Sequence, residues 1–393
     1  MTQGTAGSRP KTAKLGGLAV GWLTLFVVGT DLFVVSPILP LIARDWGLSA
    51  GAAGLGVGVF AASYMASAPL LGHVADRLGR RPVLLCCLVA FALANILTGM
   101  ATGLAGLLAA RAFAGVTAAG VTPSIYALVG EAAPPERRAS RLALMVSGLL
   151  ISLSIGTPIG ALAAATIGWK PVFAALAAAS LALVWANHQV WPATPPRGAA
   201  AGPAALGAAI LGRRLLPTVV WSTALYGMYT YLGAGLTAAG YDADAIARTI
   251  LCYGLGAILG TFAGGRAADR FGPRATMAAS LVGLGLGLVA LRLALPFPVL
   301  VVLAATMASA AAQLFFPAQQ AGLAGDFPAR RATVLAWNNS ALFLGISLGS
   351  VIGGEAVRIG GFGLDLAVCA AIAFAGWAIA AVPRREPAAV TAA

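Results

Sequence analysis

The sequence GHVADRLGRR, residues 72–81, interrupts two long apolar runs, and its pattern returns 193 residues later as GRAADRFGPR, residues 265–274. Each copy contains a glycine that can turn the chain and arginines that cannot lose their charge. Both stretches are therefore predicted to be polar loops between spans, and they indicate an internal repeat.

The same offset relates other parts of the chain. The stretch PERRAS, 135–140, corresponds to PARRAT, 328–333, and two rows of small residues at every fourth position correspond as well. These rows are Gly148, Ser152, Gly156 and Gly160 in the first copy, and Ala341, Gly345, Gly349 and Gly353 in the second. Repeated matches at one spacing predict that the chain contains two copies of a single unit.

The composition is that of a membrane protein. Hydrophobic residues make up 60% of the 393 residues and charged residues 9%, whereas a soluble domain has about 25% charged residues. The net charge of +13 does not indicate nucleic-acid binding, because the basic residues form short clusters between apolar runs instead of one basic surface. The four cysteines lie within apolar runs without metal-ligand spacing, so we expect no metal site.

Twelve apolar runs are near or above the roughly 20 residues that a helix needs to cross a bilayer. They are 15–43, 51–72, 82–100, 103–131, 141–166, 170–191, 216–239, 246–265, 275–294, 298–322, 332–357 and 363–382. An all-α membrane protein with twelve transmembrane helices is therefore expected. The first run is too long for the apolar part of a signal peptide and should be retained.

Basic residues fix the expected orientation, since arginine and lysine are enriched in cytoplasmic loops. The loops on the side of the leader 1–14, counted with the leader and the tail 383–393, carry nineteen basic residues, and the opposite loops carry five. Both termini and both copies of the repeated loop are therefore expected in the cytoplasm. The expected location of the protein is the cell (plasma) membrane.

A segment rich in proline and alanine, 192–215, separates two bundles of six spans, 15–191 and 216–382. Because each bundle has an even number of spans, the two copies have the same orientation. They are parallel repeats related by an axis along the membrane normal. A substrate site is then expected between them.

These features resemble the major facilitator superfamily over essentially the whole chain. RAFAG, 111–115, is similar to the RxxxG motif of the family's fourth span, and GTPIG, 156–160, resembles the fifth-span motif of the twelve-span drug:proton antiporters. In that motif the residue before the proline is usually glycine, where this chain has Thr157. The opening GTDLFVVSP, 29–37, is similar to the chloramphenicol-resistance and sugar-efflux branch.

The repeated loops lie where the halves must separate when the cavity opens to the cytoplasm. The resemblance implies that Asp76 docks on the start of the eleventh span, near Thr333. The second copy has Pro273 in place of Arg80, so the first copy is expected to matter more. The candidate gate residues are Gly72, Asp76, Arg77, Gly79, Arg80, Arg81, Asp269, Arg270 and Gly272.

Asp31 and Arg111 fall inside predicted spans, where charge is expensive and usually functional. Both are expected in the outer half or near the middle of the membrane, where they could meet. Their counterparts in the second copy are Ala224 and Ala304, so only one half carries the charges. We expect Asp31 to bind and release a proton as its access to water and to Arg111 changes; a structural ion pair is the alternative.

Small residues in the fifth and eleventh spans allow helices to approach closely, and Pro158 adds a bend. An architectural role and a gating role both remain open, and these spans are expected to meet the opposite half. The residues assigned to this packing or antiporter motif are Gly148, Gly156, Pro158, Gly160, Gly345, Gly349 and Gly353.

The seventh and tenth spans offer side chains for a cavity wall at helical spacings. They are Tyr226, Tyr229, Gln313, Phe316 and Gln320. Aromatic rings with a few amides suit an amphiphilic organic molecule better than an inorganic ion. Ordinary packing between helices is the alternative for each of them.

No nucleotide-binding pattern occurs, and no catalytic or metal-binding cluster falls within the spans. We therefore expect neither an enzyme nor a cofactor, and an ion gradient as the source of energy. The favoured function is efflux of a small organic molecule, chloramphenicol or another amphiphile, by proton antiport with alternating access in a monomer. The alternative is sugar or metabolite efflux by the same fold, and a uniporter, a channel or an intramembrane enzyme is less favoured.

Overall fold

The computed structural model describes residues 15–134, 137–192, 208–327 and 331–381, and these ranges contain helices and no strand. The helices of the first half are α1 Leu15–Trp46, α2 Ala50–Leu78, α3 Arg80–Met100, α4 Leu104–Ala132, α5 Arg138–Ile151, the π-helix Ser152–Gly156, α6 Thr157–Ile167 and α7 Trp169–Val190. Those of the second half are α8 Ala208–Ala238, α9 Ala243–Phe271, α10 Pro273–Ala294, α11 Pro298–Gln313, α12 Phe315–Asp326 and α13 Arg331–Ala381. The predicted leader 1–14, the tail 383–393 and residues 193–207 of the predicted linker lie outside the described residues.

The length and apolarity of the helices confirm the predicted all-α membrane fold. Within the described residues, ten helical segments are long and apolar enough to cross a membrane. One of them, in α13, covers two of the expected spans. Its helical dihedral angles are interrupted between these spans, at Gly360 and Gly361. The 31-residue helix α8 is not among the ten. The expected count of twelve therefore rests on both arms of α13 and on α8 crossing the membrane.

The two repeated motifs are much shorter as loops than the sequence suggested. α2 continues through Leu78 and α3 begins at Arg80, so that Gly79 alone separates them with φ of 94°. The second copy is built in the same way around Gly272, with φ of 84°. A positive φ is accessible to glycine without strain, so one residue is enough for the turn, and the polar residues lie on helix ends that extend past the apolar spans.

The second half also begins earlier than predicted. The linker was expected to reach residue 215, but α8 starts at Ala208. Arg214 Nη1 lies 2.8 Å from Asp326 Oδ2, and Gln319 Nε2 donates a hydrogen bond of 2.8 Å to the carbonyl of Arg214. These contacts with α12 hold the charged first turns of α8 in helical form.

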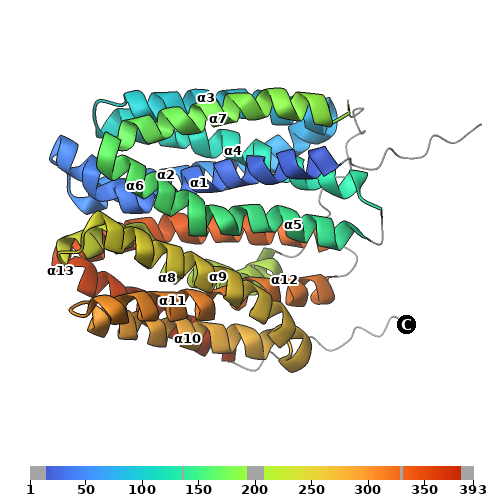
Figure 1. Ribbon diagram of the computed structural model, residues 1–393. Coiled ribbons are helices and arrows are strands. Elements are labelled where there is room, and N and C mark those ends of the chain that lie inside the picture. Colours follow the sequence, from blue (N-terminus) through green and yellow to red (C-terminus); the bar gives the residue numbers. More distant parts are fainter. Residues whose placement is uncertain (1–14, 135–136, 193–207, 328–330, 382–393) are drawn as a thin grey trace, which may run out of the picture.

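The helices of each half lie together, α1–α7 above and α8–α13 below in Figure 1. The halves meet along α1 with α8, α2 with α13, and α6 with α9. We call the end of the bundle that carries residues 72–81 and 265–274 the motif end, at the right of Figure 1, and the opposite end, with Gly360 and Gly361, the kink end. The apolar core runs through both halves and across the surface between them.

Candidate functional site

Asp31 and Arg111, the charged residues that the sequence places inside spans, lie side by side in the structure. Asp31 is in the middle of α1, Arg111 is in the first third of α4, and their side chains are 0% and 1% exposed. Arg111 Nη1 donates hydrogen bonds to Asp31 Oδ1 at 2.8 Å and to Oδ2 at 3.0 Å. The fold thus joins two residues that are 80 positions apart in sequence.

Aromatic rings surround the guanidinium group of Arg111. Its Cζ atom lies 4.6 Å from the ring centre of Phe60 and 6.0 Å from that of Phe173. Its Nε and Nη2 atoms are buried without a hydrogen-bond partner among the described residues. A buried ion pair adds little net stability, yet losing one partner leaves an uncompensated charge that costs about 3–5 kcal/mol. The two charges can therefore separate only if a proton or water compensates them.

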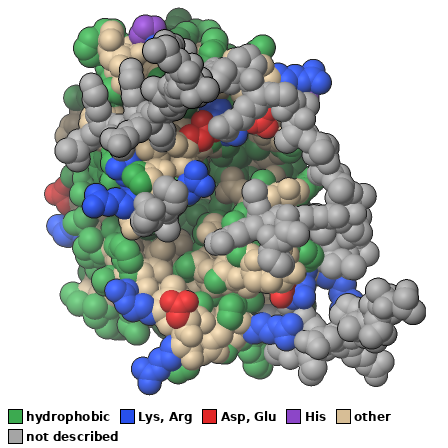
Figure 2. Space-filling view, turned by 90° about the vertical axis from the view of Figure 1, so that its right-hand side faces the viewer, with side chains coloured by type: hydrophobic (Ala, Val, Ile, Leu, Met, Phe, Trp, Pro, Cys, Tyr) green, Lys and Arg blue, Asp and Glu red, His purple; other side chains and the backbone are tan. Residues whose placement is uncertain are grey.

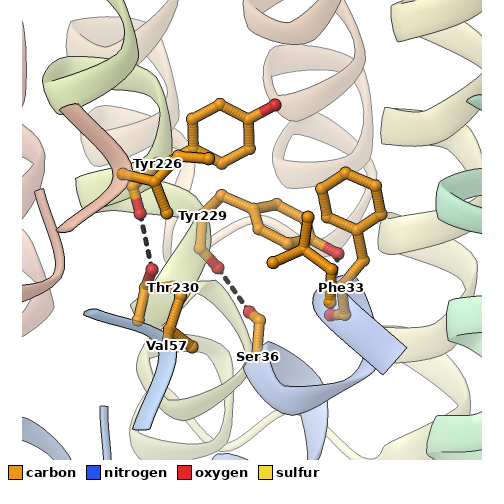
Figure 3. Close-up of a pocket in the computed structure, with 8 residues that line it drawn as sticks. Phe33, Ser36, Val57, Tyr226, Tyr229 and Thr230 are labelled. Carbon is orange, nitrogen blue, oxygen red and sulfur yellow. Dashed lines mark hydrogen bonds between the residues drawn. The ribbon is translucent and has the colours of Figure 1, made fainter. Parts of the chain in front are cut away.

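A small cavity lies where the two halves meet, and its lining includes Leu32 and Phe33, the two residues that follow Asp31 in α1 (Figure 3). Phe33, two residues after Asp31, stacks on Tyr226 with ring centres 6.4 Å apart and meets Tyr229 edge-on at 5.9 Å. The lining residues are Leu32, Phe33, Ser36, Val57, Tyr226, Tyr229, Thr230 and Ile346. The cavity of about 10 Å³ has room for roughly one water molecule. A drug-sized ligand needs about 300–1,000 Å³, so the cavity must widen before it can hold one.

The structure divides the predicted cavity residues into two groups. Tyr226 and Tyr229 line this cavity, whereas Gln313, Phe316 and Gln320 do not. Phe316 instead stacks on Trp221 at 5.9 Å, and Gln313 is buried at the end of α11. The cavity wall from the first half was not predicted, although Phe33 and Ser36 follow Asp31 on the same helix and provided a usable signal.

Hydrogen bonds between the halves gather toward the kink end. The Ser36 hydroxyl donates to the carbonyl of Tyr229, and the Tyr229 hydroxyl donates to the carbonyl of Phe33 at 3.3 Å. On the neighbouring helices, Ser350 Oγ donates to the carbonyl of Gly54 at 2.8 Å. These bonds close the halves against each other on the kink-end side of the cavity.

At the motif end, the first repeat forms a charged cluster within its own half. Arg80 donates to Asp76 at 3.1 Å and lies 2.8 Å from Glu131, while Arg81 donates to the carbonyl of His188 at 2.6 Å. Figure 2 shows this end, with a recess lined by apolar side chains near its middle and charged side chains around it. The docking of Asp76 on α13 is not among these contacts and stays a prediction.

The other candidate gate residues are more exposed. Asp269 and Arg270 of the second copy are exposed, and Arg270 lies over the ring of Phe271 at 5.2 Å. Arg77 is likewise exposed, and a side-chain carbon added to Gly72 would meet no atom within 4 Å. The two copies therefore share their turn but differ in their electrostatic contacts.

The small-residue rows pack within their own halves. Gly148, Gly156 and Gly160 approach α1, and Gly345, Gly349 and Gly353 approach α8. The fifth and eleventh spans do meet the opposite half, as expected, but through other faces, for example where Ser154 lies against Gly254 of α9. The glycines themselves fix the packing inside each half.

A π-helical segment in the fifth span precedes Pro158 and was not predicted. The N–H of Thr157 bonds to the carbonyl of Ser152, five residues earlier. Proline has no N–H to bond the carbonyl four residues before it, and a wider helical turn accommodates this loss. Pro158 therefore changes the helix type as well as its direction.

One buried acid, Asp365 on the second arm of α13, was not predicted. Its side chain is fully buried, and Cys369 is the hydrogen-bond donor to its Oδ1 atom. The signal was visible, since residue 365 falls inside the predicted span 363–382.

A bundle of membrane-spanning helices in two repeated halves, with a buried ion pair and an aromatic cavity where the halves meet, defines the class of membrane transporters. The chain belongs to the Major Facilitator Superfamily, whose sequence pattern matches residues 21–245 and 216–393.

Relatives and solved structures agree with this assignment. The chain is 30% identical over 349 residues to the uncharacterized MFS-type transporter YceJ of Bacillus subtilis, with 85% of this chain and 88% of YceJ covered. It is 29% identical over 251 residues to a chloramphenicol resistance protein of Streptomyces lividans, with 62% of this chain and 64% of that protein covered.

Among solved structures, a bacterial homologue of the human lysosomal transporter Spinster, in an inward-facing and occupied conformation, has a TM-score of 0.80 at 20% identity, covering 95% of this chain and 97% of its own. The human organic anion transporter MFSD10 has a TM-score of 0.72 at 18% identity, with 93% and 99% covered. The comparisons confirm the predicted fold, and they show that the protein is a transporter and not an enzyme.

Proposed function

We propose that this protein is a secondary active transporter that exports a small amphiphilic organic molecule in exchange for protons. The observation that carries the proposal is the buried Asp31–Arg111 pair, whose helix α1 also lines an aromatic cavity between the halves. Only the first half has these charges, because alanines stand at both corresponding positions of the second. A pair needed only to hold the repeated fold together would be expected in both halves.

Asp31 can exchange a proton because Arg111 and water compete for its carboxylate. With the pair intact, Arg111 stabilises the ionised carboxylate. When water enters the cavity and the guanidinium shifts toward Phe60 and Phe173, the carboxylate loses its partner and binds a proton instead. A substrate that occupies the cavity next to Phe33 would displace that proton, which is the exchange that antiport requires.

The excess of basic residues near the motif end supports a cytoplasmic position for that end and for both termini, in the plasma membrane. The hydrogen bonds toward the kink end then close the pathway to the outside in this conformation. Docking of Asp76 on the start of α13 belongs, in this proposal, to the opposite conformation, in which the motif end is closed. One chain contains both halves of the pathway, so a monomer suffices.

The cavity chemistry favours an amphiphilic substrate. Phe33, Tyr226 and Tyr229 supply aromatic surface, and the hydroxyls of Ser36 and Thr230 already donate to backbone carbonyls. A sugar needs many polar partners, which this lining offers sparsely. The similarity to a chloramphenicol resistance protein makes chloramphenicol the first compound to test.

The proposal is tested first by a susceptibility screen in an efflux-deficient host, with chloramphenicol and a panel of lipophilic antibiotics and dyes. The compound exported is then followed in proteoliposomes under an imposed pH gradient. Wild-type protein should move it uphill in a saturable, protonophore-sensitive manner. Asp31→Asn should abolish uphill movement while downhill exchange stays measurable, because the amide keeps the size of the side chain but cannot titrate.

Glu355→Gln is the matched control, since Glu355 is an acid in an exposed pair with Arg358. This variant should retain wild-type coupling. Full proton-coupled transport by Asp31→Asn, or an equal loss in both variants, would refute the assignment of Asp31.

A further inference from the structure

A second buried carboxylate lies in the other half, near the kink end. Asp365 follows Gly361 by four residues, about 6 Å along the second arm of α13. Cys369 Sγ donates to its Oδ1 atom at 3.3 Å, while its buried Oδ2 atom has no hydrogen-bond partner among the described residues. The first half has Val172 at the corresponding position, so this acid too is present in one copy of the repeat only.

Gly353 makes room for this carboxylate. A side-chain carbon added there would lie 2.9 Å from Asp365 Oδ1 and 3.0 Å from the ring of Tyr231. The Tyr231 hydroxyl donates to the carbonyl of Ser350 at 2.6 Å, and Ser350 Oγ donates across the halves to Gly54 at 2.8 Å. Asp365 therefore lies directly behind the contact that closes the kink end.

No described cation compensates this acid. The titratable groups around it are the thiol of Cys369 on its own helix and the phenol of Tyr231 on α8. On α10, Arg292 is exposed and approaches Gly363, and no ion pair within 4.0 Å joins it to Asp365 among the described residues. An ionised carboxylate buried without a cation is strongly disfavoured, so burial favours the protonated form of Asp365 in this conformation.

We propose that Asp365 is a second proton-binding site, separate from Asp31, that binds a proton when the kink end closes and releases it when the kink end opens. The step is simple association: water on the kink-end side supplies the proton, the Asp365 carboxylate becomes a carboxylic acid, and opening returns the proton to that same side. The site carries no proton across the membrane. It makes closure of the kink end depend on the pH of the compartment that this end faces.

The direction follows from proton linkage. The closed state holds one more proton than the open state, so higher pH favours opening, by up to tenfold in the equilibrium constant per pH unit. Lower pH on the same side holds the kink end closed. This inference depends neither on the identity of the substrate nor on the role of Asp31.

The test measures the distance between spin labels at Thr102→Cys and Ala239→Cys, exposed positions near the kink end of each half. The full-length protein is placed in lipid nanodiscs, with Cys86 and Cys252 replaced by serine and the buried Cys369 retained. In the otherwise unchanged protein, the long-distance population should grow as pH rises. Asp365→Asn imitates the neutral acid and should keep the short distance over the same pH range.

Two further variants make the result specific. Glu355→Gln, an exposed acid on α13, should respond to pH like the unchanged protein. Asp31→Asn should also keep the response to pH, because Asp365 is intact in this variant. The Asp31→Asn measurement tests the proposal even if Asp365→Asn does not fold. A distance that ignores pH in the unchanged protein, a normal response in Asp365→Asn, or a lost response in Asp31→Asn would overturn the proposal.

Discussion

At the scale of single residues, this protein holds two buried carboxylates inside its membrane-spanning helices, and their surroundings differ. Asp31 has a guanidinium partner, and that guanidinium lies over the ring of Phe60. Asp365 has no such partner within the part of the chain that the structure describes, and it lies in a space left by Gly353, next to a thiol. The first arrangement suits an ion that is exchanged, and the second suits an acid that stays neutral until water reaches it.

Replacing Arg111 by lysine tests the first arrangement at the residue scale. Lysine keeps the charge but loses the planar group that bonds both Asp31 oxygens and lies over Phe60. We expect uphill transport to fall roughly tenfold or more, since a hydrogen bond to a charged group contributes about 1.5–3 kcal/mol. The initial rate in proteoliposomes is the measurement, with protein amount and melting temperature as controls. A near wild-type rate would favour a purely structural ion pair.

At the scale of elements, glycines and one proline set the positions of the helices. A single glycine with positive φ separates α2 from α3 and α9 from α10, which keeps the charged ends of these helices close to the bundle. The first of these ends is tied down by Arg80, which contacts both Asp76 and Glu131. The second copy has Pro273 at the corresponding position, and its acid, Asp269, is exposed.

The two copies of the motif should therefore respond differently to the same substitution. Asp76→Asn removes the charge that pairs with Arg80 and, in our proposal, the docking that closes the motif end, so turnover should fall severalfold while substrate binding survives. Asp269→Asn is the matched variant and should be milder. Transport rates, together with spin-label distances across the motif end, report the outcome. Equal effects at both positions would mean that the motif acts only through its charge on membrane topology.

For the whole molecule, the repeat made most of the architecture predictable. A hydrophobic run, a positive-φ glycine and a repeated spacing are local signals, and they led to the helical membrane fold of two similar halves. The start of α8 at Ala208 was missed because its first turns carry Arg213 and Arg214, which resemble a linker until the contact with Asp326 is known.

The candidate site was less predictable, because it depends on contacts across the chain. The charges of Asp31 and Arg111 stood out against an apolar background, but the sequence did not reveal that Gln313 is not part of the cavity lining. Helical spacing gives the residues that share a face and does not say which neighbour that face meets. The same limit applies to the glycine rows, which pack on α1 and α8 and not across the halves.

If substrate and proton exchange at Asp31, substrate binding must release a proton, and this release can be measured directly. Purified protein in a weakly buffered solution with a pH indicator is mixed with the compound identified by the export screen, and binding is followed in parallel. Wild-type protein should release protons as the compound binds, and Asp31→Asn should bind the compound without release. Binding to the wild-type protein without proton release, or equal release by both proteins, would refute proton exchange at Asp31.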